Sequence, residues 1–244
     1  MKLVTARQLA IALAFYSLST PAAVYAETPD KLVLDQNSKT ALVVIKTDWW
    51  QPAPSMKSAF RLILSTYDPA EEKLLGKPFG GSIAFEARKK NFTDGYLIVP
   101  IKPGRWVFQG YSQQDIWTLC FNAASQQFEV KAGEVVYLGE FDALSHRRQL
   151  TVEALRSGKM SIRGYGFADF FDLPGGPRFR AIDEAQLAAV REMIGRRSPR
   201  VTAPVRAAEY SPARFGTGST LFAERRCGGY FATSAKGKDD KAER

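Results

Sequence analysis

Short runs of strand-forming residues, separated by turn residues, occupy the sequence from residue 40 to residue 141. The runs are rich in β-branched and aromatic side chains, and several alternate apolar and polar positions with a period of two, as a half-buried strand does. About eight such runs, with no helix-length periodic segment among them, predict a mainly β protein, an antiparallel β-sandwich or barrel, and we favour the sandwich. The predicted strands are residues 40–47, 60–67, 82–87, 96–101, 105–111, 116–121, 127–130 and 135–141.

Turn-forming segments separate several of these runs. They are Asp94-Gly95, Lys102-Pro103-Gly104 and Lys131-Ala132-Gly133-Glu134. Each contains a glycine, which tolerates positive φ, beside polar or proline residues that favour turns. Between apolar runs this chemistry indicates hairpin-like connections, so we expect each segment to join two consecutive strands.

Two stretches resemble parts of known envelope proteins. They are Leu97-Ile-Val-Pro-Ile-Lys-Pro-Gly-Arg-Trp-Val-Phe108 and Phe128-Glu-Val-Lys-Ala-Gly-Glu-Val-Val-Tyr137. They are similar to DUF2846-like and PEGA-like domains, in which a Pro-Gly-x-aromatic turn and a later Ala-Gly-x-x-x-Tyr turn each lead into a strand. The resemblance covers roughly residues 40–142 and implies a small β-sandwich in a bacterial envelope. It implies no particular enzymatic activity.

The pattern changes after Phe141. Residues 150–155 fit either one more strand or a helical turn. A helix is predicted over residues 183–195, because Asp183 is a good N-cap, with Gln186 three residues later as in a capping box. We expect this helix to pack on the sandwich.

The segment that follows is basic and interrupted by proline. Pro199, Pro204 and Pro212 exclude a long helix, so residues 198–220 are expected to be extended. The predicted organisation is a sandwich domain at 27–142, a C-terminal extension at 143–233 and a disordered tail at 234–244.

The N-terminus has the layout of a secretory signal peptide. Lys2 and Arg7 precede an apolar run, and small residues stand at Val24 and Ala26. This layout predicts a signal peptide at residues 1–26 with cleavage before Glu27, and hence a periplasmic or secreted protein. The alternatives are a retained anchor or the first helix of a domain, but the apolar run is only about half the ~20 residues that a membrane-spanning helix needs.

The two halves of the mature chain differ in charge. Residues 27–145 contain 13 Lys/Arg and 14 Asp/Glu, whereas residues 146–244 contain 19 and 11. A basic segment on an exported protein favours anionic envelope components or polysaccharides as partners over nucleic acid. The alternative is a solvated basic face that has no dedicated partner.

Two cysteines remain after the predicted cleavage, Cys120 and Cys227. In an oxidising compartment an even number of cysteines favours a disulfide, which would tie the C-terminal region to the sandwich. The alternative is two buried thiols that pack as small apolar side chains. On the disulfide hypothesis, residues 221–232 return to the sheet.

The sequence offers little for catalysis. His146 is the only histidine, and we interpret it as a surface-loop residue disfavoured as an imidazolium by Arg147 and Arg148. The sequence suggests no zinc site, no catalytic residues and no cofactor. Candidate paired carboxylates, among them Asp48, Glu86, Asp115 and Asp142, include no pair that stands out. We therefore expect a non-enzymatic structural or binding protein.

Two aromatic clusters are candidate features. Asp48-Trp49-Trp50 suggests a carbohydrate-binding module, since Trp faces stack on sugar rings and a carboxylate accepts from hydroxyls; alternatively, the tryptophans fill the core. A second set is expected to pack on an open face or end of the sandwich, and consists of Tyr165, Phe167, Phe170 and Phe171.

Overall fold

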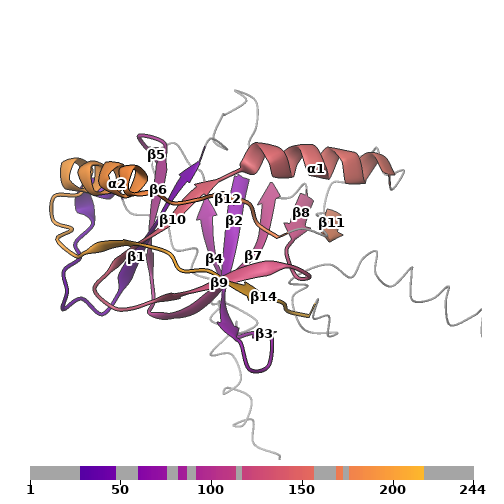
Figure 1. Ribbon diagram of the computed structural model, residues 1–244, viewed down its shortest axis with the longest axis horizontal. Helices are drawn as coiled ribbons and strands as arrows, with labels where there is room; N and C mark the ends of the chain where they lie inside the picture. Colours follow the sequence, from indigo (N-terminus) through magenta and orange to yellow (C-terminus); the bar gives the residue numbers. More distant parts are fainter. Residues whose placement is uncertain are drawn as a thin grey trace, which may run out of the picture.

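Two β-sheets lie face to face in the computed structural model, and helix α2 covers the outer face of one of them (Figure 1). The structure describes residues 28–47, 60–75, 82–86, 92–113, 117–156, 169–172 and 176–216. The elements are η1 (Pro29–Lys31), β1 (Ala41–Thr47), β2 (Phe60–Asp68), β3 (Lys73–Leu74), β4 (Ser82–Glu86), β5 (Phe92–Thr93), β6 (Tyr96–Ile101), β7 (Gly104–Gln113), β8 (Trp117–Cys120), β9 (Ser125–Val130), β10 (Val135–Phe141), α1 (Ala143–Arg156), β11 (Asp169–Asp172), β12 (Phe179–Arg180), α2 (Glu184–Arg197), β13 (Val205–Ala207) and β14 (Ser211–Ala213). The predicted mainly β sandwich is confirmed.

The strands form two mixed sheets. Sheet 1 has the order β12-β10-β1-β6-β5, and β13 also pairs with β10. Sheet 2 has the order β11-β8-β7-β2-β3, with β4 on β2, β9 on β7 and β14 on β9. The expectation of wholly antiparallel pairing was wrong in detail, because β1 with β10, β10 with β13 and β8 with β11 are parallel. Parallel pairs need long connections, which periodicity within a strand cannot reveal.

Strand β1 lies at the centre of sheet 1, and both of its faces are apolar and buried. Val43 and Ile45 point into the core between the sheets, whereas Leu42 and Val44 point to the opposite side, toward α2. The residues of α2 that close this second core are Leu187, Val190, Met193 and Ile194. Each buried side chain of this kind contributes roughly 1.5–3 kcal/mol, so the helix holds to the sheet by its apolar stripe.

The ends of α2 follow the sequence signals closely. Gln186 N–H donates to Asp183 Oδ1 (2.8 Å) and Asp183 N–H donates to Gln186 Oε1 (3.1 Å), which completes the predicted capping box. The helix continues through Gly195 and ends at Arg197. Helix α1 was not foreseen as a helix of 14 residues, because the sequence indicated only a strand or one helical turn near residues 150–155.

Two of the three predicted turns are arches between the sheets and not hairpins. Asp94-Gly95 joins β5 to β6 within sheet 1 and is a hairpin turn. The segments at 102–103 and 131–134 instead join β6 to β7 and β9 to β10, whose strands belong to different sheets. The indole of Trp106 fixes the first arch by donating to Lys102 O (3.0 Å).

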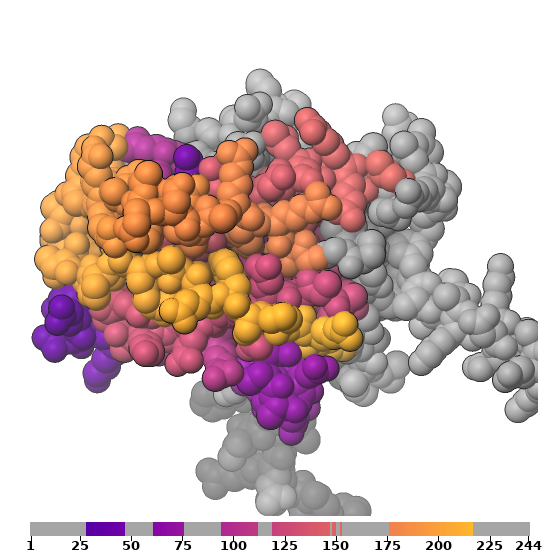
Figure 2. Space-filling view, in the orientation of Figure 1, coloured from indigo at the N-terminus to yellow at the C-terminus, as the bar shows by residue number. Residues whose placement is uncertain are grey.

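The basic segment after α2 is extended, as predicted, in its described part. We call residues 201–216 the strap. The strap pairs with β10 through β13 and then with β9 through β14, so it crosses from sheet 1 to sheet 2 along one side of the sandwich. It is the yellow band across the face in Figure 2. Residues 221–232 and the tail at 234–244 lie outside the described residues.

Gly133 shows how tightly the second arch is held. Its φ is +72°, and a Cβ at this position would lie 2.5 Å from the backbone oxygen of Gln36. Gly133→Ala should lower the free energy of unfolding by about 2–4 kcal/mol, since it adds left-handed strain to a backbone collision. Gly195→Ala is the matched control: apart from its chain neighbours and the backbone of α2, no atom of the described residues lies within 4 Å of its Cβ position. In helix α2 it should raise stability by up to about 1 kcal/mol. Urea unfolding of both variants measures the difference, and equal effects would contradict this account.

Candidate binding cleft

A cleft of about 440 Å³ lies where the strap separates from β9. Sheet 2 provides one wall and the strap the other. Between Ser211 and Gln127 the strap is still paired with β9, and beyond that point it turns toward β10. The lining residues are Arg105, Gln127, Phe128, Glu129, Lys131, Arg206, Glu209, Tyr210 and Ser211.

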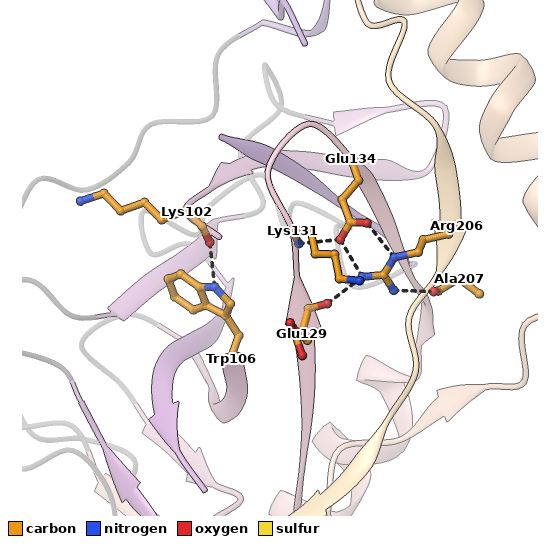
Figure 3. A network of polar contacts seen from close by, with 7 residues as sticks. All are labelled: Lys102, Trp106, Glu129, Lys131, Glu134, Arg206 and Ala207. Carbon is orange, nitrogen blue, oxygen red and sulfur yellow. Dashed lines mark hydrogen bonds and ion pairs between the residues drawn. The ribbon is translucent and has the colours of Figure 1, made fainter. Parts of the chain in front are cut away.

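Arg206 lines this cleft, and its polar contacts fix the strap there (Figure 3). Its Nε donates to Glu134 Oε2 (2.9 Å) and its Nη2 donates to Glu134 Oε1 (2.6 Å), a two-pronged ion pair. Nη2 also donates to the backbone oxygen of Glu129 (2.8 Å), and Nη1 donates to that of Ala207 (3.1 Å). The guanidinium therefore joins the strap, the end of β9 and the β9–β10 arch at one point.

Glu134 is held in its ionised form. Burial acts to raise the pKa of this carboxyl, whose side chain is only 12% exposed. Hydrogen bonds from Arg206 and from Lys131 N–H (2.6 Å), together with their positive charges, outweigh burial and place the pKa below its usual range. Arg206 in turn has its pKa raised, first by the hydrogen bond to Glu134.

Tyr210 holds the middle of the strap against the core. Its ring packs on Phe108, Phe128 and Phe179 at centroid distances of 5.9, 6.1 and 5.6 Å. Its hydroxyl donates to Leu138 O of β10 (2.5 Å). Desolvation on burial raises the pKa of this phenol well above its normal value, so it stays a neutral donor. The strap side of the cleft is therefore fixed to the core at Tyr210.

The remaining charges of the cleft are of both signs. Arg105 and Glu129 stand opposite one another on β7 and β9, with Nη2 and Oε2 4.0 Å apart. No ion pair is found for Lys131 or Glu209 among the described residues. The cleft thus offers exposed donors and acceptors side by side.

The arginines of the C-terminal part pair repeatedly with acids that precede residue 143. Arg180 lies 3.3 Å from Glu140, and Arg196 and Arg197 both bind Asp94, at 2.7 and 3.0 Å. The hydrogen bonds from Arg197 act first, and with that from Arg196 and the two positive charges they outweigh burial and hold the pKa of Asp94 below its usual value. Part of the excess positive charge of the C-terminal half is therefore paired with acidic residues of the first half.

The predicted aromatic and cysteine residues are only partly described. Asp48, Trp49 and Trp50 follow the last residue of β1 and lie outside the described residues. Phe170 and Phe171 lie in β11, paired with Thr118 and Leu119 of β8, while Tyr165 and Phe167 are outside the described part.

Cys120 lies buried in β8, in a cluster with Ala213 and Phe215 of the strap. The strap therefore reaches the face of sheet 2 that carries this cysteine. Cys227 lies outside the described residues, so the Cys120–Cys227 disulfide stays a prediction.

His146 is not a surface residue: it is fully buried in the first turn of α1. Its ring stacks on Phe141 and packs against Phe121, and Nε2 accepts a hydrogen bond from Arg178 N–H (3.0 Å). The ring is therefore neutral with its proton on Nδ1, for which the described residues provide no hydrogen-bond partner. Burial first, and then the charge of Arg178, lower its pKa to about 4. The sequence expectation failed because an isolated histidine beside two arginines resembles a polar loop.

A buried neutral histidine makes stability depend on pH. The folded state has a pKa of about 4 against 6.5 for the free side chain, so only the unfolded chain takes up the proton between these values. Stability should be full above pH 6.5 and fall by roughly 3 kcal/mol as the pH drops to 4. His146→Gln keeps an acceptor for Arg178 N–H and should remove most of this slope in urea unfolding. A slope equal to that of the parent protein would show that another group is responsible.

The described residues contain no cluster of three or more potential metal ligands, and none of their helices is long and apolar enough to cross a membrane. No protein-family model matches the chain, and neither a curated protein nor a solved structure matches it. The cleft is the feature of the described residues from which a function can be inferred. In the sequence, Pro204 and Pro212 indicated an extended segment, but no signal paired Arg206 with Glu134.

Proposed function

We propose that this is an exported protein of the bacterial envelope with a non-enzymatic binding role. The N-terminal layout supports export, and the resemblance of residues 40–142 to envelope domains supports the compartment. The observation that carries a binding role is the strap cleft. It is concave, it has the size of a small-molecule site, and its walls are sheet strands and an anchored strap.

The rigidity of the cleft favours binding over a purely structural role. Arg206 and Tyr210 hold the strap by charged and phenolic hydrogen bonds to backbone and carboxylate oxygens. The strap would be in position before a ligand arrives, so no conformational entropy would be lost in ordering it on binding. Lys131 and Glu209, which have no ion-pair partner in the described part of the chain, are available to a ligand.

Export is tested by intact mass. The full chain, expressed in a bacterium and recovered from the envelope fraction, should have the mass of a chain that begins at Glu27. Non-reducing peptide mapping of the same sample should contain a peptide pair linking Cys120 to Cys227. A protein that retains Met1 in the cytoplasmic fraction would contradict the proposed compartment.

Binding is tested with the mature protein against sacculi, lipopolysaccharide, anionic vesicles and neutral glycans. At least one should bind, and Arg105→Ala should weaken binding about tenfold if the cleft is used. Lys73→Ala, an exposed lysine on β3, is the control and should leave binding unchanged. Loss of binding on Trp49→Ala, with Arg105→Ala harmless, would move the site to the Asp48–Trp50 cluster. Absence of binding to every component would overturn the proposal.

A further inference from the structure

Internal hydrogen bonds occupy some polar groups of the cleft almost completely, and the other polar side chains can face a ligand. Arg206 uses four of its five N–H groups on Glu134, Glu129 O and Ala207 O, so it is largely a structural residue. Gln127 Nε2 donates to Pro212 O at 3.2 Å and keeps its amide oxygen. The side chains left to face a ligand are Arg105, Gln127, Glu129, Lys131, Glu209 and Ser211.

These groups balance in charge. Arg105 and Lys131 are cationic, whereas Glu129 and Glu209 are anionic, and the charge of Arg206 is matched by Glu134. An anionic ligand drawn to the two cations would meet two carboxylates in the same cleft, and a cationic ligand would meet the reverse. Like charges at contact distance work against binding, so neither sign of ligand is favoured.

The donors and acceptors alternate over a short distance. Arg105 and Glu129 are direct cross-strand neighbours, and Gln127 stands two residues before Glu129 on the same face of β9, opposite Ser211. Adjacent donor and acceptor groups suit a ligand whose own groups both donate and accept. Hydroxyl groups have this property, whereas carboxylates and ammonium groups have only one half of it.

We infer that the cleft binds a neutral, polyhydroxylated ligand, a saccharide without charged substituents. This inference rests on the proposed binding role and narrows it. The volume of about 440 Å³ lies within the range of roughly 300–1,000 Å³ found for small-molecule sites. The site differs from the Asp48–Trp50 cluster, and it uses paired polar side chains of sheet 2 and the strap.

The experiment is calorimetric titration of the mature protein with neutral oligosaccharides of two or three rings. The matched series carries one uronic acid or one amino group in place of a hydroxymethyl or hydroxyl group, and a neutral capped tripeptide is also titrated. Neutral saccharides should bind at least about tenfold more tightly than either charged series. Their affinity should change less than about twofold between 0.05 and 0.5 M salt, because no net charge is neutralised.

Substitutions in the cleft test whether the saccharide binds there. Arg105→Ala and Glu209→Ala should each weaken saccharide binding about tenfold, since each removes one charged hydrogen-bonding group. The controls are Lys73→Ala and Glu71→Ala, an exposed cation and anion at the β2–β3 turn. Circular dichroism and urea midpoints confirm that all four variants fold.

Each outcome has a separate meaning. Tighter binding of an anionic saccharide, or of the tripeptide, would overturn the ligand class and leave the binding role in place. Saccharide binding that survives both cleft variants would overturn the site. No binding to any member of the panel, while sacculi or another envelope component still binds, would refute the inference alone. No binding to any envelope component would refute the proposed function as well.

Discussion

The two-pronged contact between Arg206 and Glu134 holds the two sheets and the strap in one arrangement. Glu134 belongs to the arch that leads from sheet 2 to sheet 1, and Arg206 belongs to the strap that crosses in the opposite direction. A carboxylate that is 12% exposed loses much of its hydration, and the fork together with Lys131 N–H replaces it. Without this contact the strap would be held beside the cleft by its strand pairing and by Tyr210, and it would lose its link to the β9–β10 arch.

The same arrangement gives the basic C-terminal part a role in folding. The acids at positions 94, 134 and 140 each bind arginines that come later in the chain. Exposed ion pairs such as those of Asp94 each contribute little to the free energy of unfolding. Their main effect is to fix the register and orientation of the C-terminal segment against the sandwich. Residues 176–216 therefore complete the sandwich, and their position is set jointly by apolar packing under α2 and by these contacts.

Strand positions could be predicted because alternation and turn chemistry are local. The run predicted at 96–101 is β6, and that at 135–141 is β10, with the same boundaries. The partner of each strand could not be predicted, since the turn at 131–134 has the same residues whether it closes a hairpin or an arch. The cleft could not be predicted from the sequence for the same reason, because Arg206 and Glu134 are far apart in the chain. His146 was misjudged because burial depends on Phe121 and Phe141, which only the fold brings beside it.

The central position of β1 has a consequence for synthesis. Its residues from Ala41 to Ile45 are almost wholly buried, with β6 on one edge and β10 on the other. Leu42 pairs with Val135, about 90 residues further along the chain. At translation rates of roughly 5–20 residues per second, the strand spends on the order of 5–20 s without its second neighbour. During that time a two-sided apolar segment with one open edge is a template for wrong pairing. Correct pairing of β1 therefore requires that its open edge stay unpaired until β10 has been made.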